Sequence, residues 1–182
     1  LTHFGDSLYF FIPTILTWAL VKIIKSKNQI INTISEISLF IFLNILLSGI
    51  VTQILKHAIG RPRPVLFNGF EQKSLSIISF DSKWHSFPSG HTATIFAFIF
   101  CMVLLFPKIK NILITVAIII ASTRVIVGAH FVSDIFGGAI VAYLSSIFIS
   151  KNLANKKILF TTDGEKLFPN SNVNIISSYI AK

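Results

Sequence analysis

The sequence predicts an all-α protein of the polytopic membrane class, a helical bundle with five spans visible of an expected six-helix core. Of its 182 residues, 53% are hydrophobic and only 13% are charged. The apolar residues form long unbroken runs, whereas a soluble fold would space them at helical or alternating intervals. Because lipid offers backbone polar groups no partners, an open chain crosses it only as helices. These observations disfavour a soluble protein with a large core.

Five apolar stretches approach the length of about 20 residues that crosses a bilayer. Several are short, so we expect neighbouring polar residues to continue the helices toward the membrane surface, which places Arg124 near that surface. No repeat, low-complexity tract or domain-sized linker separates the stretches, and one helical domain is therefore expected. The predicted spans are residues 8–24, 37–55, 93–106, 112–126 and 135–149.

The distribution of cations predicts the orientation, because Lys and Arg are enriched on the cytoplasmic side of membrane proteins. Alternate threading puts ten lysines on one side, which we assign to the cytoplasm, and six cations on the other. The first set is Lys22, Lys25, Lys27, Lys108, Lys110, Lys151, Lys156, Lys157, Lys166 and Lys182; the second is Lys56, Arg61, Arg63, Lys73, Lys83 and Arg124.

This threading leaves Leu1 outside, and we expect a further helix to precede it in the full gene product. The polar stretch 56–89 becomes a folded external loop whose aromatic residues suit the membrane interface. We expect residues 1–151 to form the membrane-embedded domain and residues 152–182 to be a cytoplasmic C-terminal tail.

Charge and cysteine content exclude other classes. The net charge of +9 comes from short clusters between apolar segments, which is typical of membrane anchoring, so no nucleic acid partner is expected. Cys101 is the single cysteine, and the chain can form neither an internal disulfide nor a cysteine-based zinc site.

Three polar clusters stand at predicted span ends, where a charge in the bilayer carries a cost and needs a reason. The orientation places all three on the outer side. Together they supply permanent cations, a hydroxyl, a glycine amide and two imidazoles, a set that suits a tetrahedral oxyanion. The clusters are Lys56 with Arg63 and Pro64; Pro88, Ser89, Gly90 and His91; and Arg124 with His130 and Asp134.

The third cluster also predicts a nucleophile. His130 and Asp134 are four residues apart, so on a continuous helix they share a face and the carboxylate fixes the imidazole tautomer. His91, at the mouth of the third span, is the complementary acid for a departing oxygen. Ser89 and the Gly90 amide lie just ahead of a helix, where backbone donors favour anions.

In order and spacing, these motifs resemble the type 2 phosphatidic acid phosphatase superfamily. The resemblance implies that His130 attacks phosphorus, that Asp134 orients it and that His91 acts as the acid. It also implies a six-helix core, an outward-facing site, and no metal or other cofactor. The residues implied to bind phosphate are Lys56, Arg63, Ser89, Gly90 and Arg124.

The resemblance covers positions 56–134, and the flanking helices fit the same plan. Thr123 stands where the family usually has Ser before the arginine, and the upstream helix is absent. Each cluster alone has an ordinary explanation: interfacial anchors, a Pro-Ser-Gly turn, or a structural His–Asp hydrogen bond. Three clusters in the right order favour the enzyme.

Other polar residues near the clusters have weaker claims. His57 and His85 are expected to be loop bystanders, and His3 and Asp6 to be solvated. Arg61 is close to Arg63, and a phosphate or diphosphate contact for it stays open.

The function expected from these residues is removal of a phosphate from a lipid headgroup through a phosphohistidine. The bilayer and a lipid phosphate are the expected partners, and the family suggests lipid A, undecaprenyl diphosphate, phosphatidic acid or phosphatidylglycerol phosphate. Similarity to bacterial envelope phosphatases implies an inner membrane location with the site facing the periplasm or exterior. A lipid phosphotransferase with the same site and a small anion transporter are the alternatives.

Overall fold

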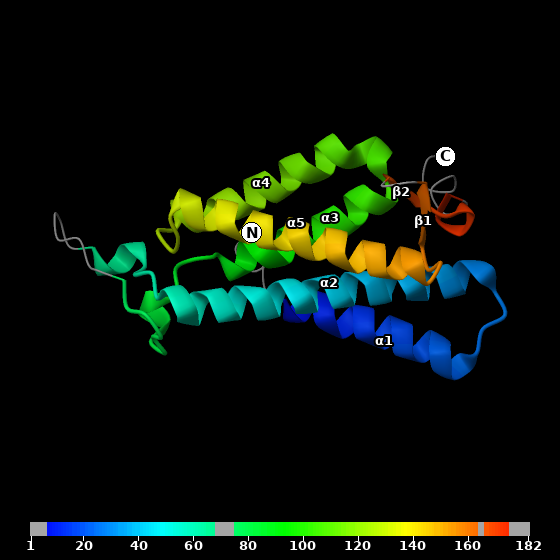
Figure 1. Ribbon diagram of the computed structural model, residues 1–182, viewed down its shortest axis with the longest axis horizontal. Coiled ribbons are helices and arrows are strands. Elements are labelled where there is room, and N and C mark those ends of the chain that lie inside the picture. The colour runs from blue at the N-terminus through cyan, green and yellow to red at the C-terminus, as the bar shows by residue number, and fades with distance from the viewer. Residues whose placement is uncertain (1–6, 68–74, 164–165, 175–182) are drawn as a thin grey trace.

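The computed structural model describes residues 7–67, 75–163 and 166–174, and within them the chain is a bundle of five α-helices with a small hairpin at one end (Figure 1). His3, Asp6, Lys73 and Lys182 lie outside the described residues. The all-α membrane bundle is confirmed. The helices are α1 (Leu8–Ile24), α2 (Gln29–Ile59), α3 (Gly90–Leu105), α4 (Lys110–Ile126) and α5 (Val132–Asn155); short 3-10 turns are η2 (Pro64–Leu66), η3 (Ser82–Trp84) and η4 (Pro107–Ile109); the strands are β1 (Phe160–Asp163) and β2 (Lys166–Pro169).

α1 has the predicted limits; α2 and α5 extend beyond the predicted stretches at both ends, and α3 and α4 begin earlier than predicted, although α3 ends one residue earlier. α2 is capped at its start by Asn28, whose side chain accepts hydrogen bonds from the first turn, and at its end by Gly60 in the left-handed conformation. A span prediction follows hydropathy, whereas backbone hydrogen bonding continues until a cap interrupts it. Lys56 therefore lies on the last turn of α2 and not in the loop predicted to begin there.

Among the described residues, three helical segments are long and apolar enough to cross a membrane: Gln29–Leu66, Pro107–Ile126 and Val132–Asn155. The other two predicted spans, α1 and α3, are apolar helices of 17 and 16 residues. Together these segments make the chain a multi-pass membrane protein.

The helices pack closely because small residues face one another. α3 lies between α2, α4 and α5 (Figure 1). The buried alanines Ala97, Ala117, Ala121 and Ala142 let neighbouring backbones approach, as is typical of helix contacts in membranes.

A buried polar stripe runs along α2 toward one end of the bundle. Asn44, Ser48, Thr52 and Lys56 recur every four residues, so they share a helix face, and each is less than one-tenth exposed. The side-chain nitrogen of Asn44 (Nδ2) donates to the carbonyl of Ala97 at 2.7 Å and to the Ser146 hydroxyl at 2.7 Å. These bonds tie α2 to α3 and α5 and set how the helix faces are turned.

The segment that follows α5 packs against the bundle. Leu159, Phe160 and Val173 are fully buried, and the Phe160 ring meets Phe40 of α2 edge-on at 5.1 Å. The domain boundary expected after residue 151 falls inside α5, which continues to Asn155. The cytoplasmic location of this end stays a prediction. The α1–α2 connection, the α3–α4 connection and the end of α5 all lie at this end (Figure 1), and each of the three carries lysines, in line with the prediction.

Candidate active site

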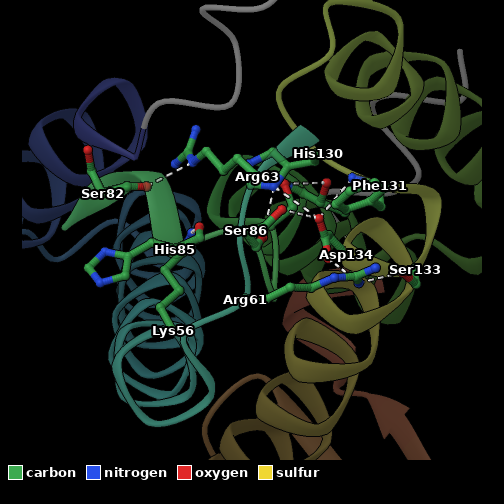
Figure 2. A network of polar contacts seen from close by, with 12 residues as sticks. Lys56, Arg61, Arg63, Ser82, His85, Ser86, His130, Phe131, Ser133 and Asp134 are labelled. Atoms are coloured by element: carbon green, nitrogen blue, oxygen red, sulfur yellow. Dashed lines mark hydrogen bonds and ion pairs between the residues drawn. The ribbon is translucent and has the colours of Figure 1, made fainter. Parts of the chain in front are cut away.

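The three predicted clusters meet at the end of the bundle away from the hairpin (Figure 1). That end is built from the last turns of α2 and α4, the first turns of α3 and α5, and the described residues 60–67 and 75–89 between α2 and α3. Figure 2 shows the polar network there, with Lys56, Arg63 and His130 from three separate parts of the chain.

Lys56 is held by a neighbouring carbonyl and by the start of α3. Its side chain is buried, and its ammonium donates to the carbonyl of His85 at 2.8 Å. A β-carbon at Gly90 would stand 3.7 Å from the Lys56 Cε, so the first residue of α3 lies directly against the lysine stem. An ammonium has three donors, and the bond to His85 uses one of them.

Arg63 and Arg124 complete a cluster of cations around Lys56. The Arg63 Nε donates to the carbonyl of Ser82 at 3.0 Å, which holds its side chain in one orientation. Both arginines lie close enough to Lys56 to repel its ammonium, and Arg63 repels Arg124 in turn. Three mutually repelling cations need an anion between them to be favourable, so the cluster fits an oxyanion.

The Arg124 guanidinium carries a second indication of a ligand. Its Nε is buried and has no hydrogen-bond partner among the described residues. Buried donors are normally satisfied, because leaving one unpaired costs about 1–3 kcal/mol. An anion in the cation cluster would supply the missing acceptor.

Ser89 and Gly90 begin α3 at the edge of this cluster. The Ser89 hydroxyl accepts from the Thr92 amide at 3.4 Å and from the Thr92 hydroxyl at 3.1 Å, and thereby caps the helix. The Ser89 amide donates to the carbonyl of Asp134 at 2.9 Å. The phosphate contact predicted for Ser89 stays a prediction. α3 begins with Gly90 and His91, so the positive end of its helix dipole lies at the site.

His130 lies in the turn between α4 and α5, and the expectation that it shares a continuous helix with Asp134 is wrong. α5 begins at Val132, after Phe131 as its N-cap. The amide of His130 donates to the carbonyl of Arg124 at 3.2 Å, which closes the turn. The spacing of four residues predicted correctly that His130 and Asp134 lie together, but a turn and not a shared helix brings them together.

The environment of His130 determines which ring nitrogen is available. Its Nδ1 stands 2.8 Å from the carbonyl of Ser86 and 3.5 Å from a carboxylate oxygen of Asp134 (Figure 2). A carbonyl only accepts, so Nδ1 carries the hydrogen of the neutral ring. This leaves the lone pair on Nε2, the nitrogen that can attack.

Burial lowers the pKa of His130 below its ordinary value, and the cationic fields of Lys56 and Arg63 act in the same direction. The adjacent Asp134 opposes them but does not reverse the shift. The imidazole is 3% exposed. At neutral pH it is therefore uncharged, which is the form required of a nucleophile.

Asp134 is fully buried and has more partners than the sequence indicated. It accepts from the Ser86 hydroxyl at 2.5 Å, from the Phe131 amide at 2.8 Å and from the Arg61 guanidinium at 2.7 Å. The same guanidinium nitrogen donates to the Ser133 hydroxyl at 2.7 Å. Arg61, left open as a phosphate ligand, is thus the counter-ion of Asp134 (Figure 2).

Sequence reasoning missed Ser86 and a pair of glycines. Ser86 supplies the carbonyl that holds His130 and the hydroxyl that bonds to Asp134, and nothing in its local sequence distinguishes it.

The glycine pair, Gly137 and Gly138, did have a signal in the sequence, since two successive glycines inside an apolar helix often mark a close backbone approach. A β-carbon there would lie 2.6 Å from the Ser89 carbonyl oxygen, so α5 and α3 touch at this point.

His85 lies in the segment between α2 and α3 as expected, but His57 lies on the last turn of α2 and not in the loop. The His85 Nε2 lies 2.8 Å from the carbonyl of Ser79, and its ring centre is 4.4 Å from that of His57. His57 also bonds to the carbonyl of Gln53. Only the main-chain carbonyl of His85 reaches the cation cluster, through Lys56.

Within the described part of the chain, no three His, Cys, Asp or Glu side chains gather as metal ligands would. The donors around the site are cations and hydroxyls, which suit an anion better than a metal ion.

Comparison with known proteins gives a family model and two similar relatives. The model of the PAP2 superfamily matches residues 38–158. The "Lipid A 1-phosphatase" of Rhizobium johnstonii (strain DSM 114642 / LMG 32736 / 3841) is 39% identical over 145 residues, which are 76% of this chain and 59% of that protein. The "Lipid A 1-phosphatase" of Rhizobium etli (strain ATCC 51251 / DSM 11541 / JCM 21823 / NBRC 15573 / CFN 42) is 35% identical over 182 residues, a match that covers 93% of this chain and 78% of that protein.

A solved structure shares the fold. It is described as the first transmembrane PAP2 type phosphatidylglycerolphosphate phosphatase from Bacillus subtilis, and it superposes with a TM-score of 0.55 at 22% identity. The match covers 85% of this chain and 73% of the other.

Proposed function

Since the chain belongs to the PAP2 superfamily, we propose that it is a lipid phosphatase whose site is the cation cluster around His130. The observation that carries the proposal is the meeting of Lys56, Arg63 and Arg124 beside a buried neutral imidazole whose Nε2 is left as the nucleophile. The unpartnered Nε of Arg124 supports an anion in the same place.

In the proposed reaction, the three cations bind the non-bridging oxygens of the phosphate. The His130 Nε2 attacks phosphorus, the ester bond breaks, and His91 gives a proton to the departing lipid oxygen. Water then gives a proton to His91 and attacks the phosphohistidine, which breaks the N–P bond, releases phosphate and restores both the neutral His130 ring and the protonated His91. Fixed cations stabilise the charge on the phosphoryl oxygens without reorganising.

The supporting residues give His130 its orientation. Ser86 holds Nδ1–H through its carbonyl, and its hydroxyl holds Asp134. Asp134 adds a negative charge beside the imidazole and is itself balanced by Arg61. The proton on Nδ1 and the positive charge that forms on the ring during attack are thus both stabilised.

For the substrate we propose a phosphate of lipid A, because both relatives carry the name lipid A 1-phosphatase. The proposed location is a bacterial inner membrane with the site on the periplasmic face. The gathering of lysines at the opposite end of the bundle supports this orientation.

The proposal is tested by phosphate release from purified lipids in detergent, with a metal chelator present throughout. We expect lipid A to lose phosphate at a rate unchanged by the chelator, and undecaprenyl diphosphate and phosphatidic acid to react more slowly. Transfer of labelled phosphate to an added lipid or sugar, with little free phosphate, would instead identify a phosphotransferase. Anion flux in liposomes without phosphate release would identify a transporter.

The pH dependence of catalysis follows from the lowered pKa of His130. Protonation removes the nucleophile, and because the folded-state pKa lies below about 6.5, the ring stays neutral down to a pH below that value. The histidine titration, followed by NMR of the ring carbons with His130→Gln to assign the signal, should show this directly. A His130 pKa at or above the ordinary value would contradict the account.

A further inference from the structure

A short apolar segment, residues 75–80, is exposed at the active-site end of the bundle, between α2 and α3 (Figure 1). Four of its six side chains are large and apolar, and each is between 59% and 81% exposed: Leu75, Ile77, Ile78 and Phe80. Among the described residues outside the α-helices, no other stretch exposes such a group. Single exposed apolar side chains are ordinary, whereas a contiguous group of them marks an interaction surface.

Polar contacts hold the 75–80 segment in place while its apolar side chains face away from the protein. The Ser76 amide donates to the carbonyl of Gly60 at 2.8 Å, where a β-carbon on Gly60 would overlap the Ser76 carbonyl. Ser79 is buried, and its carbonyl lies 2.8 Å from the His85 Nε2. Ile78 has a φ of 58°, a conformation that is rare for a β-branched residue. A contact partner for the exposed side chains would offset the cost of this turn.

The 75–80 segment lies on the side of α2 that faces lipid. Ile50 and Ile54 are exposed and four residues apart, so they share one face of this membrane-spanning helix. His57 follows Ile54 by three residues and continues the same face on the last turn. The Phe80 ring lies against the His57 ring, with 5.6 Å between their centres. The exposed segment therefore extends the lipid-facing side of α2 beyond the end of the helix.

The length of α2 places the segment at the depth of the lipid headgroups. The helix has 31 residues, which at 1.5 Å each make about 46 Å, close to the thickness of about 40–45 Å of a bilayer with its headgroups. Its first turn lies beside Lys27 at the opposite surface, so its last turn reaches the other headgroup region. Lys83 and Trp84, in the neighbouring turn η3, are residue types that favour the same region.

We propose that the 75–80 segment is a membrane-contact surface, whose apolar side chains enter the headgroup region of the leaflet on the active-site side. Its partner is bilayer lipid, because the segment continues the lipid-facing side of α2 and lies at the depth where that helix ends. Apolar side chains buried at the boundary between headgroups and acyl chains stabilise such contacts. The inference goes beyond the proposed phosphatase function and does not depend on it.

The contact has a consequence for the cation cluster, because the residues next to the segment hold two of its members. His85 bonds to Ser79 through its ring and accepts a hydrogen bond from the Lys56 ammonium through its carbonyl (Figure 2). The Arg63 amide donates to the carbonyl of Lys83 at 2.8 Å. A lipid contact that steadies the 75–80 segment therefore steadies Lys56 and Arg63, and an anion binds more tightly to cations that are already in position.

The test of the contact measures how deeply single positions lie in a bilayer, with the whole chain in phosphatidylcholine vesicles. Cys101 is buried, so a thiol-reactive fluorophore labels an introduced cysteine. Ile78→Cys carries the label on the 75–80 segment, and Ser82→Cys carries it on an exposed polar position nearby. We expect bromine atoms on the acyl chains to lower the emission of Ile78→Cys about twofold or more, and that of Ser82→Cys much less. Quenching at Ile78→Cys no stronger than at Ser82→Cys would overturn the membrane contact, as it would if another protein or a second copy covered the segment.

The test of the consequence uses two substitutions of Ile78 and the binding of inorganic phosphate in the same vesicles. Asparagine adopts the left-handed conformation more readily than isoleucine, so Ile78→Asn keeps the turn and loses the apolar contact, whereas Ile78→Leu keeps an apolar side chain. We expect the Kd for phosphate to rise about threefold or more in Ile78→Asn and to change less in Ile78→Leu. Wild-type affinity in Ile78→Asn would overturn the link between the segment and the cation cluster. Neither test requires turnover, so a failure of the proposed lipid phosphatase activity is seen separately, as absent phosphate release.

Discussion

Replacing His130 with alanine is expected to lower phosphate release by about 10³-fold or more, because the variant has no nucleophile and keeps only the cation cluster. The fold should persist, since the Ser86 hydroxyl, the Phe131 amide and Arg61 still satisfy Asp134. The measurement is the initial rate of phosphate release from the lipid substrate, alongside trapping of labelled enzyme after a rapid quench.

His57→Ala is the matched control, since it removes a histidine from the same end of the bundle whose ring bonds to the Gln53 carbonyl. It should keep near-normal activity. His91→Ala tests the acid: it should lose about 10²-fold or more on a lipid ester, and far less on a nitrophenyl ester whose leaving group needs no proton. Normal phosphate release by His130→Ala would refute the mechanism.

A methyl group at position 138 is expected to be nearly as damaging, although Gly138 touches no substrate in the proposed reaction. In Gly138→Ala the new β-carbon would stand 2.6 Å from the Ser89 carbonyl oxygen and 3.1 Å from the Ala93 amide. Backbone atoms cannot swing away, so α3 must shift from α5. We expect a loss of about 1–3 kcal/mol in stability from overpacking.

The larger effect of Gly138→Ala is on catalysis. The shift of α3 lengthens the hydrogen bond from the Ser89 amide to the Asp134 carbonyl, and it displaces Gly90 and the Lys56 side chain that lies against it. A displacement of about 1 Å in a catalytic site can lower the rate by about 10²-fold. Thermal unfolding and phosphate release should be measured together. Gly49→Ala is the control, because nothing lies within 4 Å of its β-carbon. Equal behaviour of the two variants would show that α3 and α5 do not need this contact.

The helical architecture was accessible from hydropathy because each helix satisfies its own backbone, which makes a span a local property. The ends of helices were less accessible. Lys56 was assigned to a loop because it is charged, yet the α2 ladder continues to Gly60, whose φ of 56° suits glycine. His130 was assigned to a helix because of its distance from Asp134, yet α5 begins two residues later.

The sequence by itself determined the span pattern and supplied the three clusters, since residue types and short spacings are local. Their convergence at one end of the bundle is a property of the fold. So are the contact of the His130 Nδ1 with the Ser86 carbonyl, which leaves the Nε2 lone pair available, and the pairing of Arg61 with Asp134. Those contacts join residues 44 and 73 positions apart, and no local periodicity encodes them. Helix packing decided them, because the close approach at Gly138 sets where α3 and α5 present their first turns.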